Sequence, residues 1–152
     1  MPPLPTDTPT KEVLQAAFDV SLPVSGGWGY TQDDALRIEQ NPDNTPLAQF
    51  EHMLISMRLY LEMNLTRKEE ERYGSINLNE KSRKRHTTEH IVLDEVCYTL
   101  TAMKESDYAK FIEEYKEGYG KDDFDVQEHF AKRKEATLTQ EVTCWFDVTN
   151  VS

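Results

Sequence analysis

Residues 138–148 read LTQEVTCWFDV, one of the two clearest alternating segments of this 152-residue chain. Apolar side chains at Leu138, Val142, Cys144, Phe146 and Val148 alternate with the polar Thr139, Glu141, Thr143 and Asp147. Successive side chains of a strand leave opposite faces of a sheet, so a period of two indicates a half-buried β-strand. We therefore predict a strand here, with one face against the core.

Three more segments predict strands. From residue 13 to residue 24 every even position is apolar, and Pro23 indicates an edge position or the end of that strand. Residues 35–39 could pair back as a short second strand after a glycine-rich turn. Residues 91–103 are rich in β-branched side chains. The two cysteines, Cys97 and Cys144, fall in predicted strands, where we expect reduced, buried thiols.

A long helix is predicted over residues 46–65. Thr45 can cap it, and Pro46 suits the first position, where the missing N–H costs nothing. Apolar side chains fill a broad arc of this helix, and Glu51, Arg58 and Glu62 form only a narrow polar stripe. So wide an apolar surface implies burial on more than one side. Residues 46–65 are therefore either the central helix, which we favour, or in part a subunit interface.

Two shorter helices should follow residues 91–103. Ser106 is placed to cap the first, which ends near Gly118. Its apolar stripe has helical spacing and consists of Tyr108, Phe111, Ile112 and Tyr115. Asp125 and Glu128 form the aspartate version of a capping box for a second helix to about Glu135.

This order of elements predicts an α+β fold. We expect an antiparallel sheet of about four strands, with the long central helix and the two shorter helices packed on one face. Residues 1–10 hold four prolines and predict a flexible N-terminal tail. Residues 11–152 then form a single domain with a polar, partly basic loop at about 66–90.

Charge limits the classes of partner. With 28 acidic and 17 basic residues the net charge is −11, which repels nucleic-acid phosphates and anionic membranes and attracts a basic protein. The N-terminus lacks the pattern of a signal peptide, and no apolar stretch reaches the roughly 20 residues that a membrane helix needs. We therefore expect a cytoplasmic protein.

The string His86-Thr87-Thr88-Glu89-His90 matches the H-x-x-E-H pattern of zinc peptidases. On a helix, His86 and His90 would share a face as metal ligands, and Glu89 would act as the general base. The apolar residues that follow indicate a strand, which weakens this interpretation. A zinc-dependent hydrolase is therefore an alternative, and no cofactor is expected otherwise.

The glycine loop contains Gly26, Gly27, Trp28, Gly29 and Tyr30. Its glycines suggest backbone angles closed to other residues. It lacks the spacing of a phosphate-binding loop, but its aromatic side chains could contact a ligand or a partner. These five residues are the candidate binding site, and the competing interpretation is that they cover the edge of the core.

Other polar residues give weaker signals. His52 and His129 are interpreted as surface or hydrogen-bonded histidines, because no nucleophile can be assigned beside them. The acidic pairs Asp33-Asp34 and Asp122-Asp123 lack the ligand spacing of a calcium loop.

The leading functional hypothesis is a non-catalytic interaction domain, a small acidic binding or inhibitor protein of the immunity type. Its support is the negative charge, the wide apolar surface of residues 46–65 and the lack of a convincing catalytic set. The alternatives are the zinc hydrolase and a homodimeric structural protein joined through residues 46–65.

Overall fold

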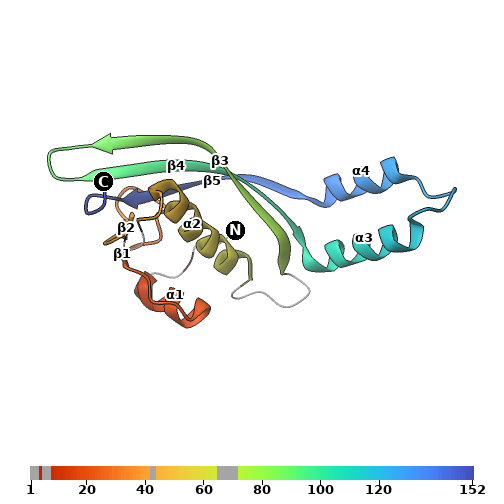
Figure 1. Cartoon of the computed structure of the whole chain (residues 1–152), viewed down its shortest axis with the longest axis horizontal. Helices are drawn as coiled ribbons and strands as arrows, with labels where there is room; N and C mark the ends of the chain where they lie inside the picture. The colour runs from red at the N-terminus through yellow and green to blue at the C-terminus, as the bar shows by residue number, and fades with distance from the viewer. Residues whose placement is uncertain (1–3, 5–7, 42–43, 65–71) are drawn as a thin grey trace.

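The computed structural model describes residues 4, 8–41, 44–64 and 72–152, as an α+β fold (Figure 1). Its elements in chain order are α1 (Thr10–Phe18), β1 (Val24–Gly26), β2 (Leu36–Ile38), α2 (Leu47–Asn64), β3 (Tyr73–Thr87), β4 (Val92–Lys104), α3 (Glu105–Gly118), α4 (Val126–Ala136) and β5 (Leu138–Asp147). In this part of the chain, no helix is both long and apolar enough to cross a bilayer.

The strands form a mostly antiparallel sheet, as predicted. Over the described residues it has five strands in the order β1-β2-β5-β4-β3, and only the β2–β5 pair is parallel. The predicted strands at 35–39, 91–103 and 138–148 are confirmed as β2, β4 and β5. β3 is therefore an edge strand of 15 residues.

One face of the sheet carries the core. Cys144 lies opposite Val96 on this face, which packs against apolar residues of α2 such as Leu54, Ile55 and Leu59. Alternate residues point to the other face, where Thr143 lies opposite Cys97. Because only one face is covered, β4 and β5 alternate between apolar and polar side chains, as antiparallel sheets commonly do.

The predicted first strand is wrong over most of its length. Residues 10–18 form α1, and the strand that follows the next loop, β1, begins only at Val24. Leu14 is buried and Phe18 packs against the core one helical turn later. A spacing of four residues fits a helix as well as a strand, and the neighbouring Glu12, Gln15 and Ala16 favour helix.

The predicted tail also makes contacts where it is described. Leu4 is buried, and its N–H donates to the hydroxyl of Tyr30 at 2.9 Å. The hydroxyl of Thr10 donates to the carbonyl oxygens of Gly26 and Gly27 at 3.2 and 3.1 Å. These bonds connect the start of the chain to the glycine loop.

The predicted loop at about 66–90 is wrong for residues 73–87, which form β3; residues 65–71 lie outside the described part. β3 pairs with β4 from Tyr73 to Thr87, with register shifts before Asn77 and Ser82. Its second half has no apolar alternation, because Arg83 and Arg85 lie on the core side and pair with carboxylates there. A pattern search for apolar residues misses such a strand.

The long helix begins at Leu47, one residue after the predicted start at Pro46, and its polar stripe is buried. Glu51 is 0% exposed and Arg58 2%, and Glu62 is also buried. Tyr60, from the predicted apolar arc, is half exposed instead. α2 therefore directs charged side chains toward the sheet, where ion pairs hold them.

The two shorter helices form but are not packed on the sheet. α3 begins at Glu105, one residue before the predicted cap, with Lys104 at the N-cap position. α4 begins as predicted, and Asp125 Oδ1 accepts from the Glu128 N–H at 3.0 Å. Figure 1 shows both helices projecting beyond the end of β4 and β5, and no described residue of either belongs to the main core.

Two glycines with similar positive φ angles allow a matched test of packing around the glycine loop. At Gly29 (φ 85°), an added Cβ would lie 2.6 Å from Cys144 Sγ, whereas at Gly120 (φ 80°) it would meet nothing within 4 Å. Gly120→Ala should lower the free energy of unfolding by about 1 kcal/mol, the cost of the backbone angle. Gly29→Ala should lower it by about 3 kcal/mol, because steric overlap is added. Urea denaturation measures both, and equal losses would contradict this packing.

Candidate functional site

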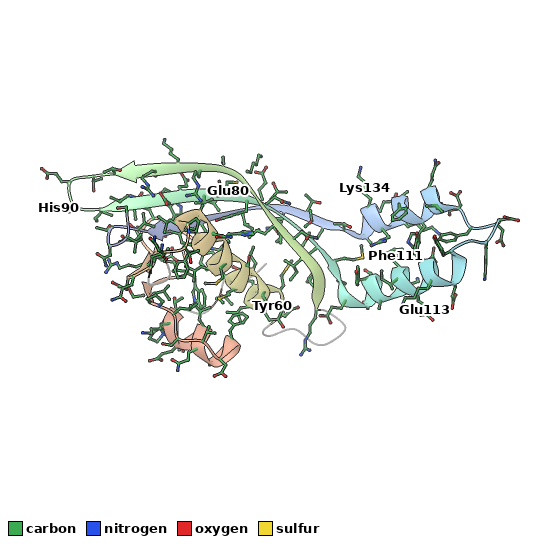
Figure 2. The ribbon with its side chains drawn as sticks, in the orientation of Figure 1. Tyr60, Glu80, His90, Phe111, Glu113 and Lys134 are labelled. Atoms are coloured by element: carbon green, nitrogen blue, oxygen red, sulfur yellow. The ribbon has the colours of Figure 1, made fainter. Side chains whose placement is uncertain are left out.

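The α3–α4 hairpin, residues 105–136, is the part of the molecule built most like a binding surface, and we call it the arm. Inside it, the His129 ring is 1% exposed and lies among four aromatic rings at centroid distances of 5.3 to 5.9 Å. These rings belong to Phe111, Tyr115, Phe124 and Phe130. Figure 2 shows Phe111 between the two helices. This small aromatic core holds the two helices together.

The outside of the arm exposes large apolar side chains. Tyr119 is 73% exposed and Phe130 48%, and Tyr108 and Val126 are also exposed. Tyr108, Ala109 and Ile112 line a shallow hollow of about 380 Å³ on α3. α4 has only 11 residues and cannot cover all the apolar side chains of the predicted α3 stripe. In the sequence, the width of that stripe was the feature that indicated exposed apolar side chains.

The arm is acidic toward its tip. Residues 105–136 contain ten acidic and six basic residues, a net charge of −4. Within residues 113–128 the numbers are seven and two, a net charge of −5. Three of the basic residues, Lys132, Arg133 and Lys134, lie near the base of α4. The exposed Tyr119 therefore has several acidic residues before it and after it in the sequence.

A buried ionic cluster lies where α2 crosses β3 and β4. Arg83 Nη1 is 2.9 Å from Glu51 Oε1 and 3.5 Å from Asp94 Oδ2, and Arg85 Nε is 2.8 Å from Asp94 Oδ1. Arg83 Nη2 also contacts Glu80 Oε1 at 2.7 Å. We call these five residues the Glu51 cluster.

The two buried carboxyl groups of the Glu51 cluster have opposite pKa shifts. Burial raises the pKa of Glu51 to about 8, and a hydrogen bond to Asp94 together with the charge of Asp94 adds to this effect. Burial also disfavours ionised Asp94, but hydrogen bonds from Arg85 and Glu51 hold its pKa below the usual value. At neutral pH these shifts favour a neutral Glu51 beside an ionised Asp94.

A buried arginine of α2, Arg58, holds the glycine loop in place. Arg58 Nη1 donates to the carbonyl oxygen of Trp28 at 3.1 Å, and the guanidinium carbon lies 4.3 Å from the centre of the Tyr30 ring. Arg58 Nε is 3.5 Å from Glu62 Oε1, which accepts from the Tyr30 hydroxyl. Burial and that hydrogen bond raise the pKa of Tyr30.

Contacts with other parts of the fold therefore hold the predicted binding residues of the glycine loop. Trp28 is 1% exposed and belongs to the core, in line with the competing interpretation. Gly26 and Gly29 have the positive φ angles that the sequence suggested, and at Gly27 an added Cβ would lie 2.3 Å from Asp34 O. A binding role for these five residues stays a prediction.

The structure does not bring the H-x-x-E-H residues together on a helix. His86 is in β3, with Nε2 3.2 Å from Glu95 Oε1 and its ring 5.2 Å from the Trp145 ring. Figure 2 shows His90 in the turn between β3 and β4, where Glu89 is also almost fully exposed. Among the described residues, no three histidine, cysteine or acidic side chains are grouped to hold a metal ion.

The remaining candidate residues take part in packing or in hydrogen bonds of the fold. Cys144 is buried, as predicted, which raises the pKa of its thiol to about 12, whereas Cys97 is only half buried; both are free thiols. His52 is exposed on α2 and stacks on Tyr98 with ring centroids 5.8 Å apart. His129 lies in the aromatic core of the arm, not on the surface. Asp34 accepts hydrogen bonds from Thr31.

The chain matches no protein-family model, and it matches neither a curated protein nor a solved structure at a significant level. The functional argument therefore depends on the geometry of the molecule.

The raised pKa of Glu51 predicts a pH-dependent contribution to stability. The pKa of Glu51 is near 4.5 in an unfolded chain and about 8 in the folded one, so Glu51 binds more protons in the folded protein between these values. Its contribution to the free energy of unfolding is largest below pH 4.5 and falls as the pH rises through 8. Between pH 5 and pH 8 we expect this contribution to fall by about 3 kcal/mol, measured by urea denaturation.

In Glu51→Gln most of that decline should vanish, because the amide cannot titrate. Glu141→Gln is the matched control, since Glu141 is exposed and pairs with Lys81 at the surface. It should retain the decline of the wild type. A Glu51→Gln variant that loses stability with pH as the wild type does would rule out a proton on Glu51.

Proposed function

We propose that this protein is a non-catalytic interaction domain, an acidic binding or inhibitor protein of the immunity type, and that the arm binds its partner. The observation that carries this proposal is the set of exposed apolar side chains on a helical hairpin whose tip is acidic. The partner is expected to present basic and apolar side chains together.

The apolar part of the arm supports binding on energetic grounds. Isolated helices of 14 and 11 residues are marginal in water, and the arm has only its own aromatic core for support. Exposed aromatic side chains such as Tyr119 and Phe130 are the residue types that anchor interfaces. Covering them with a partner would bury apolar area and would stabilise the hairpin as well.

The charge of the arm supports a basic partner. A net charge of −5 over residues 113–128 and of −11 over the chain would attract a basic surface and accelerate the encounter. The same charge opposes the docking of one acidic tip on another. With about 20 Å of helix on each side, the arm is long enough for an interface of standard size.

The two alternatives have weaker structural support. The zinc hydrolase needs His86 and His90 on one helical face, and these residues lie in a strand and a turn. The homodimer through residues 46–65 needs a free apolar face, and α2 packs Leu54, Ile55 and Leu59 into the core.

The double variant Tyr119→Ser/Val126→Ser tests the arm. Both side chains are exposed, so stability should change little, whereas retention of the partner should fall about tenfold or more. The measurement is affinity capture with immobilised full-length protein, followed by identification and titration of the protein that the wild type retains at low salt. Added salt should release that partner, because charge attraction is screened.

Ile91→Ser is the matched control, since Ile91 is as exposed as Val126 but lies in the turn between β3 and β4. It should retain the partner as the wild type does. Equal retention by the arm variant and the control would show that the arm is not the binding surface.

A further inference from the structure

The uncovered apolar side chains of the arm form two stripes along its length. Ile112 and Tyr119 follow Tyr108 by four and eleven residues, one and three helical turns, which places all three on one flank of α3. Tyr108 and Tyr119 are exposed, and Ile112 lines the hollow of that helix. Val126 and Phe130, also exposed, are four residues apart on α4. The uncovered surface therefore extends along the arm and is not confined to its tip.

The charge of the arm changes sign along the same direction. The tip, residues 113–128, has a net charge of −5. We call the other residues of the arm, 105–112 and 129–136, its base. The base contains three acidic and four basic residues, a net charge of +1. An arm with this charge distribution is complementary to a second arm that runs in the opposite direction.

The charged side chains at both ends are available for such a contact. Within the described part of the chain, Asp122, Asp123 and Lys134 are exposed and form no ion pair. Lys132 pairs with Glu128 at 3.3 Å, but both side chains are more than half exposed. An exposed pair of this kind contributes little to stability, so a second arm can exchange for it at small cost.

We propose that the arm pairs side by side with the arm of a second copy of this chain, in antiparallel orientation about a twofold axis. Each acidic tip then lies against the base of the other arm, and the symmetry makes this contact twice. The base presents basic and apolar side chains together, since the Arg133 guanidinium carbon is 5.4 Å from the centre of the exposed Phe130 ring. The inference rests on the proposed function in one respect, that the arm is the binding surface.

The size of the arm indicates how strong the pair is. At 1.5 Å per residue, α3 is about 21 Å long and α4 about 17 Å, and two such hairpins form a four-helix arrangement. In the described part of the chain, no other element lies beside the outer half of the arm (Figure 1). The contact is near the lower limit of standard interfaces, about 1,200 Å² in total, and the charge of −11 on each copy opposes it. We therefore expect a reversible dimer with a micromolar dissociation constant.

Sedimentation equilibrium of the full-length protein at physiological salt measures this association. The wild type should change from monomer to dimer between about 5 and about 200 µM. Lys132→Glu/Arg133→Glu/Lys134→Glu, the base variant, changes the charge of the base from +1 to −5. It should self-associate about tenfold more weakly or less, because like charges then face each other at both ends of the pair.

Mixing two variants tests the antiparallel orientation. Glu117→Lys/Asp122→Lys/Asp123→Lys, the tip variant, changes the charge of the tip from −5 to +1, so its own dimer is also weakened. When one tip variant pairs with one base variant, opposite charges face each other at both ends. The mixture should therefore associate at least as tightly as the wild type. A variant whose arm had unfolded would not be rescued in this way.

Lys11→Glu/Lys81→Glu/Lys84→Glu is the matched control, since it changes the net charge as much as the base variant does, at exposed positions outside the arm. It should associate within a few-fold of the wild type. The proposal is overturned by a wild type that stays monomeric throughout this range, by a mixture that does not associate, or by a control as weak as the base variant.

These results are separable from those for the proposed function. If the wild type is monomeric while affinity capture returns another protein that Tyr119→Ser/Val126→Ser does not retain, the arm binds that protein and not a second copy. If the mixture of variants associates but no other protein is captured, the pairing of arms holds and the inhibitor function fails.

Discussion

A buried arginine on the central helix connects the parts of this fold. Arg58 contacts the Trp28 carbonyl in the glycine loop, the Thr143 carbonyl in β5 at 3.5 Å, and Glu62 on its own helix. Removing water from a guanidinium costs several kcal/mol unless partners replace the lost hydration. Each of these partners must therefore keep its position for α2 to lie against the sheet, and the glycine loop is rigid for the same reason.

The Glu51 cluster extends this principle to the edge of the sheet. Arg83 and Arg85 replace the apolar residues that a core-facing strand normally has. The ionised carboxylates of Asp94 and Glu80 balance their charge, and Glu51 accepts a hydrogen bond from Arg83. β3 can therefore pair with β4 over its whole length although its second half is basic. The same charges protect that half of the strand from pairing with another chain.

The arm follows a different physical rule. Its aromatic core is separate from the main core, and its helices join the sheet at the end of β4 and the start of β5, where α3 also contacts β3 (Figure 1). A hairpin of two helices cannot cover all the apolar side chains that helical spacing places around α3. The exposed aromatic residues and the acidic tip result from this geometry, and they make the arm suitable for a partner that supplies the missing surface.

The sequence alone determined the elements that are defined by local patterns of apolar, polar and capping residues. The strands near 91–103 and 138–148, the helix from Pro46 and the Asp125 cap depend on neighbours in the sequence, so local patterns predict them. The apolar stripe of α3 was also predicted, but the sequence did not show that part of this stripe is exposed to solvent. Only the tertiary structure decided that residues 10–18 are a helix, since Leu14 and Phe18 fit either period. It also decided that Glu51 and Arg58 are buried and that Arg83 pairs with Glu51. Glu51 and Arg83 are 32 residues apart, and a charged residue indicates burial only when its distant partner is known.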